Sequence, residues 1–224
     1  MPRVVLPPML LTLIVGASCL TKAFSLLADE PNTLPSDDAP RWSIEAVSND
    51  RNTAERAVSS LRRLGPAGLA AFCEVHAREL ADLRTQPSLR LQTNSAAQRL
   101  SDTIDQIAGQ RDAAWAELYW HTDFATALAT ARRENKPILT LRLLGKLTDE
   151  LSCANSRFFR TTLYSDPAIA DRLRQDFVLH WQSVRPVPKI TIDFGDGRKL
   201  ERTITGNSAH CLEPHGTGIL AGRD

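Results

Sequence analysis

Apolar positions recur every three or four residues between positions 52 and 118. This spacing places side chains on one face of an α-helix. The sequence "LGPAG" interrupts the first such stretch, where Gly65 is expected to cap one helix and Pro66 to open the next. Further helices are expected over about 66–84 and 95–118. Three helices, each with one apolar stripe, predict a small bundle.

The pattern changes near residue 119. An amphipathic helix is predicted over 123–134, and two apolar strands over 138–145 and 177–184 with helices between them. A strand, a helical connection and a second strand predict a right-handed parallel crossover. Alternating apolar residues on both sides of "GDG" predict a β-hairpin over 189–205.

These patterns predict a mixed fold, α+β or α/β. A helical region over 51–118 is expected to precede a strand-containing domain over 119–224.

The first 50 residues follow neither pattern. Arg3 precedes a mainly apolar run over 4–20, and Ala23 and Ser25 form a small-residue cleavage pattern, so residues 1–25 predict a signal peptide. Residues 26–50 are expected to form a flexible linker, because 26–40 hold three prolines and four acidic residues. An uncleaved leader or a lipid-carrying Cys19 are alternatives. All three predict an exported protein, periplasmic or extracellular, with possible membrane anchoring.

The net charge and the number of cysteines limit the classes of function that the chain can have. The formal net charge is +1, which offers no electrostatic footprint for nucleic acid. Without the leader, Cys73, Cys153 and Cys211 remain, and an odd number leaves at least one thiol unpaired within the chain. "CEVH" (73–76) and "HCLEPH" (210–215) lack paired zinc-ligand spacing, so no metal and no cofactor are expected.

Two histidines beside tryptophans, His121 and His180, are expected to be structural hydrogen-bonding residues.

Cys153 is the candidate for chemistry. It follows a predicted strand and loop and lies in the first turn of the next helix, where free amides and the positive helix end stabilise a thiolate. Arg157, one turn later, is expected to add positive charge, while Asp149 and Glu150 oppose it. We expect a lowered pKa for the Cys153 thiol. The alternative is a buried structural cysteine.

Residues 124–188 resemble a segment of the thioredoxin-like superfamily. The resemblance rests on "KPIL" (136–139), "CANS" (153–156) and "FV" (177–178), and extends to uncharacterised exported bacterial proteins with such a domain. It implies a thioredoxin-like domain with an added hairpin and places Cys153 at the position of the attacking thiol. Ser156 replaces the cysteine that would resolve a mixed disulfide.

The same resemblance implies a cis-proline opposite the thiol. Pro188 is one candidate. If the hairpin is an insertion, "GNSAHCLEPHG" (206–216) supplies the later strand and Ser208 takes the proline position. The glycines of "GTGILAGRD" (216–224) argue against a closing helix, so this end of the domain is expected to be incomplete.

Two functional hypotheses follow. One is a non-catalytic interaction scaffold, or a weak monothiol, that binds a partner protein. The other is disulfide exchange or capture of protein clients through Cys153, in which case the chain is at most a monothiol thioredoxin-like oxidoreductase.

Overall fold

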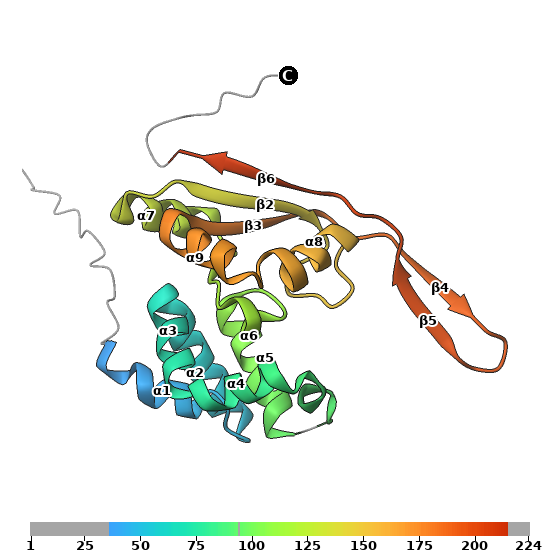
Figure 1. Ribbon diagram of the computed structural model, residues 1–224, viewed down its shortest axis with the longest axis horizontal. Coiled ribbons are helices and arrows are strands. Elements are labelled where there is room, and N and C mark those ends of the chain that lie inside the picture. The colour runs from blue at the N-terminus through green and yellow to red at the C-terminus, as the bar shows by residue number, and fades with distance from the viewer. Residues whose placement is uncertain (1–35, 94, 215–224) are drawn as a thin grey trace, which may run out of the picture. The chain divides into compact units, whose positions relative to one another are not determined.

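The computed structural model describes residues 36–93 and 95–214, which lie in one compact unit, Leu34–Asp224 (Figure 1). The predicted signal peptide, Cys19, His215 and the segment 216–224 lie outside the described residues. The described part is a mixed α and β fold with a mixed sheet, as predicted.

A group of short helices forms the first half of the described chain. Asp50 and Ser95 cap two of them, since each side chain accepts a hydrogen bond from the amide three residues later. The elements are η1 (Ser36–Asp38), α1 (Ala39–Glu45), α2 (Arg51–Arg63), α3 (Pro66–Val75), α4 (Ala77–Thr85), η2 (Pro87–Leu91), α5 (Ala96–Ala108) and α6 (Ala113–Ala116).

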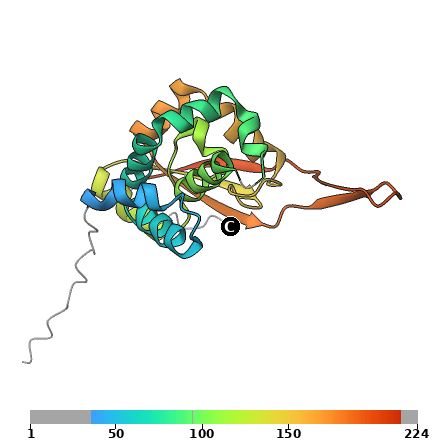
Figure 2. The same ribbon diagram turned by 90° about the horizontal axis from the view of Figure 1, so that it is seen from below.

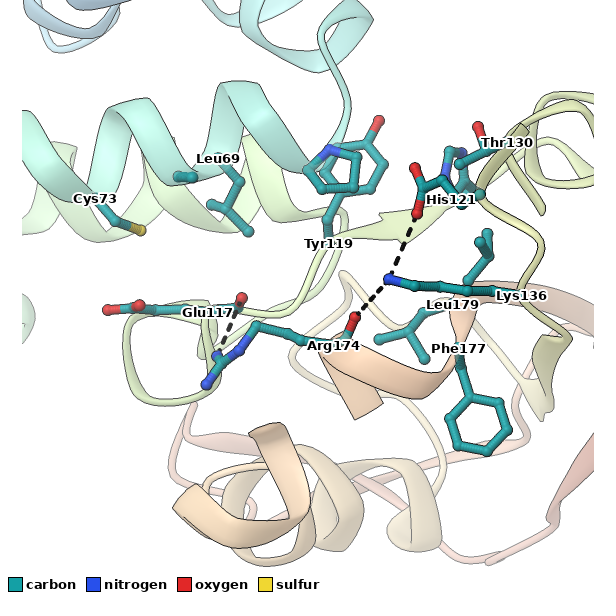
Figure 3. Close-up of a pocket in the computed structure, with 14 residues that line it drawn as sticks. Leu69, Cys73, Glu117, Tyr119, His121, Thr130, Lys136, Arg174, Phe177 and Leu179 are labelled. Carbon is teal, nitrogen blue, oxygen red and sulfur yellow. Dashed lines mark hydrogen bonds and ion pairs between the residues drawn. The ribbon is translucent and has the colours of Figure 1, made fainter. Parts of the chain in front are cut away.

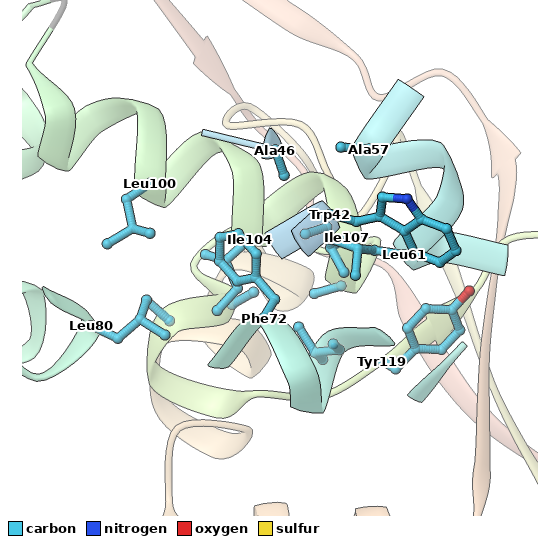
Figure 4. Packing of buried hydrophobic residues seen from close by; sticks show 14 of the residues in the cluster. Trp42, Ala46, Ala57, Leu61, Phe72, Leu80, Leu100, Ile104, Ile107 and Tyr119 are labelled. Atoms are coloured by element: carbon cyan, nitrogen blue, oxygen red, sulfur yellow. The ribbon is translucent and has the colours of Figure 1, made fainter. Parts of the chain in front are cut away.

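The helices enclose one apolar core (Figure 4). Leu61, Phe72, Ile104 and Ile107 are fully buried there. Replacing a buried leucine or isoleucine of this kind by alanine typically costs about 2–5 kcal/mol. Burial of these stripes therefore accounts for the bundle that the periodicity predicted.

The folded part begins before the predicted boundary at residue 51. Helix α1 lies inside the predicted flexible linker, 26–50, and its Trp42 is only 8% exposed. Ala39 and Ala46 are buried in the same cluster. The prolines and acidic residues suggested a tether, but this buried apolar surface offsets the entropy of ordering the segment.

Two predicted long helices are each divided by a tertiary contact. The predicted helix 66–84 breaks at His76, whose Nε2 lies 3.0 Å from the carbonyl oxygen of Ser43. The predicted helix 95–118 stops at Gly109, which adopts φ 72° and whose carbonyl accepts a 2.8 Å hydrogen bond from Trp181 Nε1. Both partners are distant in sequence, so local spacing could not reveal these breaks.

A four-stranded sheet forms the second half. Strands β1 (Trp120–His121) and β2 (Ile138–Leu144) both run parallel to β3 (Val178–Arg185), which confirms the parallel arrangement predicted for β2 and β3. Strand β6 (Ser208–Glu213) is antiparallel to β2, so the strand order is β1-β3-β2-β6.

Helices pack against both faces of this sheet. Leu139, Leu141 and Leu143 share a buried cluster with residues of α9 (Pro167–Asp176). Ile138 packs instead with α7 (Phe124–Glu134). Because side chains alternate along a strand, α7 and α9 cover opposite faces.

The predicted hairpin is confirmed as β4 (Lys189–Asp193) paired with β5 (Lys199–Thr203). Figures 1 and 2 show it as a two-stranded ribbon that extends beyond the end of the four-stranded sheet. It lies between β3 and β6 along the chain, as the insertion alternative proposed. The described residues contain no cis peptide bond, so the prediction of a cis-proline at Pro188 is wrong. The strand paired with β2 is β6 rather than β4, which Pro188 precedes.

Asp105 makes the helical half sensitive to pH. Its Oδ1 accepts a 2.8 Å hydrogen bond from the amide of Ala113, at the start of α6. Burial raises the pKa of Asp105 to about 7, and the nearby charge of Asp112 acts in the same direction. The folded protein therefore binds this proton more tightly than the unfolded chain does. The contribution of this bound proton to stability is complete below about pH 4 and is lost as the pH rises through about 7.

We predict that Asp105→Asn stabilises the protein at pH 8, because it removes a buried charge and keeps the acceptor oxygen for Ala113. One pKa unit corresponds to about 1.4 kcal/mol, so we expect the free energy of unfolding at pH 8 to rise by at least that amount. Denaturant unfolding measures it. The gain should shrink as the pH falls to 4, and an unchanged or lowered stability at pH 8 would contradict the assignment.

Candidate functional site

Cys153 lies at the start of a helix that follows strand β2. It is the N-cap residue of α8 (Ala154–Phe158), and its amide donates a 3.3 Å hydrogen bond to the carbonyl of Leu144, the last residue of β2. The sequence predicted that Cys153 lies inside the first turn of this helix, one position after the N-cap. The side chain is 0% exposed, so the sulfur is covered in this conformation.

Two polar contacts flank the sulfur. Cys153 Sγ lies 3.3 Å from Ser156 Oγ and 3.4 Å from the carbonyl oxygen of Asn207. Burial raises the pKa of the Cys153 thiol, but hydrogen bonds from the Ser156 side chain and from backbone groups outweigh it, and the net pKa is lowered. The site therefore favours ionisation of a sulfur that solvent does not reach.

Ser156 can serve both protonation states of the thiol. Its hydroxyl now donates a 2.9 Å hydrogen bond to the carbonyl of Cys153, which leaves Oγ free to accept from S–H. A hydroxyl has one proton and rotates freely. When the thiol ionises, a turn of this hydroxyl toward the sulfur gives the thiolate a donor.

Arg157 does not take the position expected for it. Its Nη2 donates a 3.0 Å hydrogen bond to Thr203 Oγ1 at the end of β5. The groups that lower the pKa of Cys153 are hydrogen bonds, chiefly those of Ser156, rather than this guanidinium. Arg157 instead helps to fix the segment that covers the sulfur.

Residues 203–208, here called the strap, cover the start of α8. The carbonyl of Thr205 accepts a 3.1 Å hydrogen bond from the amide of Ala154, and Thr203 Oγ1 donates a 3.3 Å bond to the carbonyl of Ser152. The strap joins β5 to β6. It therefore connects the outer hairpin directly to the strand beside the thiol.

Ser208 opens strand β6 and pairs in register with Leu143 of β2. Its Oγ is buried without a hydrogen-bond partner among the described residues. The backbone of the preceding residue, Asn207, contacts the sulfur. Pro188 lies between β3 and β4, outside this pairing.

The sequence did not reveal the aromatic group that anchors β6. His210 Nε2 lies 2.6 Å from the Tyr164 hydroxyl, and its ring packs at a tilt against Phe159, with 4.8 Å between the ring centroids. Tyr164 and Phe159 belong to the same apolar cluster as Cys153. Phe159 opens a π-helical turn, η3 (Phe159–Leu163), and Tyr164 directly follows it; the local spacing did not predict this turn.

A buried ion pair holds the loop that precedes Cys153. Arg160, only 3% exposed, donates through Nε to Asp112 Oδ2 at 2.8 Å. Its Nη1 donates to the carbonyl of Asp149 at 2.9 Å and to Ser152 Oγ at 2.7 Å. Burial raises the pKa of Asp112, but hydrogen bonds from Arg90 and Arg160 outweigh it and lower the pKa. Asp112 therefore stays ionised.

Among the described residues, the other cysteines offer Cys153 no partner. Cys73, Cys153 and Cys211 are all free thiols there. Cys211 alternates with Ser208 and His210 along β6, so its side chain points to the opposite face of the sheet. Cys73 is half-buried and packs against the helical core, and burial raises the pKa of its thiol to about 12.

Across residues 36–93 and 95–214, no cluster of three or more histidine, cysteine or acidic side chains is arranged to hold a metal ion. No helix in that part of the chain combines the length and the apolar character needed to span a membrane.

We predict that Arg160→Met destabilises the protein by about 3–5 kcal/mol, because it leaves Asp112 buried with only Arg90 as a partner and frees the loop before Cys153. Denaturant unfolding measures the change. The control is Arg172→Met, which removes an exposed ion pair with Asp176 and should change stability by less than about 0.5 kcal/mol. Equal effects of the two substitutions would contradict the structural role of Arg160.

Comparisons with protein-family models, with curated proteins and with solved structures gave no match for this chain.

Proposed function

We propose that this chain is an exported thioredoxin-like protein whose Cys153 acts as a monothiol toward disulfides of protein clients. One observation carries the proposal. The sulfur lies at the N-cap of the helix that follows a parallel strand and its loop, and Ser156 stands three residues later in contact with it. The strand order β1-β3-β2-β6, with β6 antiparallel, supports the resemblance to the superfamily.

The chemistry needs no group beyond the client and an external thiol. The Cys153 thiolate attacks one sulfur of a client disulfide, the S–S bond breaks, and the leaving sulfur departs as a thiolate that takes a proton from water. A mixed disulfide between Cys153 and the client remains. Ser156 has no thiol with which to attack it, so an external thiol regenerates Cys153 by a second exchange. Capture is therefore expected to outlast that of a dithiol protein.

The covered sulfur makes movement of the strap a part of this function. Because Cys153 is fully buried beneath residues that also hold the hairpin, a client disulfide reaches it only when the strap lifts from α8. The hydrogen bonds of Thr203 to Ser152 and Arg157 oppose this opening. Reactivity is thus set by two quantities, the pKa of the thiol and the fraction of open strap.

A non-catalytic interaction scaffold is the second candidate. The observation that favours it is the exposed apolar face of the hairpin, where Ile190, Ile192 and Phe194 are 41–53% exposed. These residues lie on one face, since they alternate along β4 and the turn that follows it. In this case the buried Cys153 would only pack the domain, and its thiol would remain unreactive.

We predict that Cys153 ionises with a midpoint below about 8.5, the ordinary cysteine value, and that Ser156→Ala raises this midpoint. The measurement is the rate of alkylation by iodoacetamide against pH, in a Cys73→Ser, Cys211→Ser background. The control is Ser165→Ala, which removes a similar hydroxyl-to-carbonyl bond outside the site and should leave the midpoint unchanged. A folded protein that resists alkylation at every pH would support the scaffold instead.

We predict that Thr203→Val speeds alkylation of Cys153 at a fixed pH. Valine keeps the shape of threonine but removes both hydrogen bonds of its hydroxyl, each worth about 0.5–1.5 kcal/mol, so the open strap should become at least about twofold more populated. Thr191→Val, at an exposed position of β4, is the matched control and should not alter the rate. An unchanged rate in Thr203→Val would refute gating by the strap.

A further inference from the structure

The outer edge of strand β4 is unpaired in the described part of the chain. The hairpin forms a separate two-stranded sheet of β4 and β5 (Figure 1). Every residue of β4 is exposed, whereas Leu200 and Thr203 of β5 are half-buried, and Thr203 bonds to Ser152 beside α8. The β5 side of the hairpin therefore contacts the body of the protein. Strand β4 is the edge that another chain can reach, and an unpaired strand edge is a template for pairing.

One hydrogen bond fixes which backbone groups of β4 point outward. The amide of Phe194 donates to the carbonyl of Arg198 across the hairpin at 3.1 Å. Bonded and non-bonded pairs alternate along an antiparallel ladder, so every second residue of β4 counted back from Phe194 bonds to β5. The intervening residues, Lys189, Thr191 and Asp193, direct their N–H and C=O groups to the outer edge. That edge therefore offers three donors and three acceptors.

The sequence of β4, KITID, complements itself across a two-fold axis. When two copies run antiparallel with Thr191 opposite Thr191, Lys189 of each copy faces Asp193 of the other. On the opposite face of the sheet, Ile190 of each copy faces Ile192 of the other. Opposite charges and β-branched side chains directly across an antiparallel ladder both stabilise the pairing. The same register joins the backbone groups that point outward.

Other arrangements of the hairpin lose this match. A shift of one residue pairs threonine with isoleucine and sets outward-pointing backbone groups against inward-pointing ones. A shift of two residues pairs Thr191 with a charged residue. A parallel pair in register sets Lys189 against Lys189 and Asp193 against Asp193. Pairing of β5 with its own copy about the strand centre sets Glu201 against Glu201. Strand β4 in the antiparallel register is therefore the self-complementary edge.

The exposed apolar face of the hairpin also favours a second copy. Ile190, Ile192 and Phe194 are 41–53% exposed on one face of two strands. A two-stranded hairpin is marginally stable by itself in water, and three or more strands with an apolar face are needed for independent stability. Pairing along β4 joins two hairpins into four antiparallel strands and places the isoleucines of the two copies side by side.

We propose that a second copy of this chain pairs antiparallel along β4, with the two-fold axis at Thr191. The contact spans five residues of each copy. Because so short a contact buries less than the roughly 1,200 Å² typical of stable interfaces, we expect reversible association with a dissociation constant of about 10–100 μM. The interface does not involve Cys153. It would therefore persist even if the proposed thiol chemistry were wrong.

Analytical ultracentrifugation of the full chain between about 1 and 500 μM tests the proposal. We expect a shift from monomer to dimer, unchanged in Cys153→Ser. Lys189→Glu places like charges opposite each other twice, and so does Asp193→Lys, so each variant should weaken association at least about tenfold. A mixture of these two variants restores opposite charges and should associate again, which misfolded variants would not do. The control is Lys199→Ala, which removes the 3.4 Å ion pair to Asp193 within one hairpin and should leave the dimer unchanged.

A cysteine at the axis locates the contact. The Cα atoms of a bonded antiparallel pair are about 5.5 Å apart, which is within the range of a disulfide. In a chain with Cys19, Cys73 and Cys211 replaced by serine, Thr191→Cys should give a disulfide-linked dimer on mild oxidation. Glu201→Cys, equally exposed on β5, should not.

Three outcomes would overturn the proposal. A chain that stays monomeric at every concentration would leave the hairpin to a different partner protein. Association that is insensitive to the charge reversals, or equal cross-linking from the β4 and β5 positions, would place the contact elsewhere on the molecule.

Discussion

The buried pair between Arg160 and Asp112 is the interaction on which the candidate site depends. It joins a turn of the helical half to the loop that directly precedes Cys153. Two charges removed from water are stable together only when their remaining hydrogen-bonding groups are also satisfied. Here Arg90 donates a second hydrogen bond to the Asp112 carboxylate. The remaining donors of Arg160 bond to Ser152 Oγ and to two loop carbonyls.

This anchor explains how a thiol can be both activated and covered. With the loop fixed, α8 begins at Cys153, and the sulfur meets Ser156 on one side and the strap on the other. The strap continues into β6, where His210 forms a hydrogen bond with the Tyr164 hydroxyl. The hairpin is therefore mechanically connected to the thiol. A partner that binds the hairpin would act on the same residues that control access to the sulfur.

Sequence patterns predicted the parts of this fold that depend on local chemistry. The hairpin followed from alternation around two glycines, and the position of Cys153 followed from a strand and the helix after it. Strand β1 was missed because two residues are too few to show a period. The sequence supports β6 as only one of two alternatives, because the strand is short and half exposed, and its pairing with β2 decides between them.

The remaining features arise from contacts between distant residues. His76 interrupts a helix because Ser43 accepts its hydrogen bond, and Arg157 faces Thr203 because the hairpin returns beside α8. A cavity beside α3 draws its walls from residues 66 to 179 (Figure 3). No local spacing encodes such combinations.

The central claim is that the protein stabilises Cys153 as a thiolate, and ultraviolet absorbance of the thiolate against pH tests it without requiring access to the sulfur. In a chain that keeps Cys153 as its sole thiol among the described residues, we expect an absorbance step centred below about pH 8.5, absent in Cys153→Ser. A step at or above that value in the folded protein would contradict the account and leave Cys153 as a packing residue.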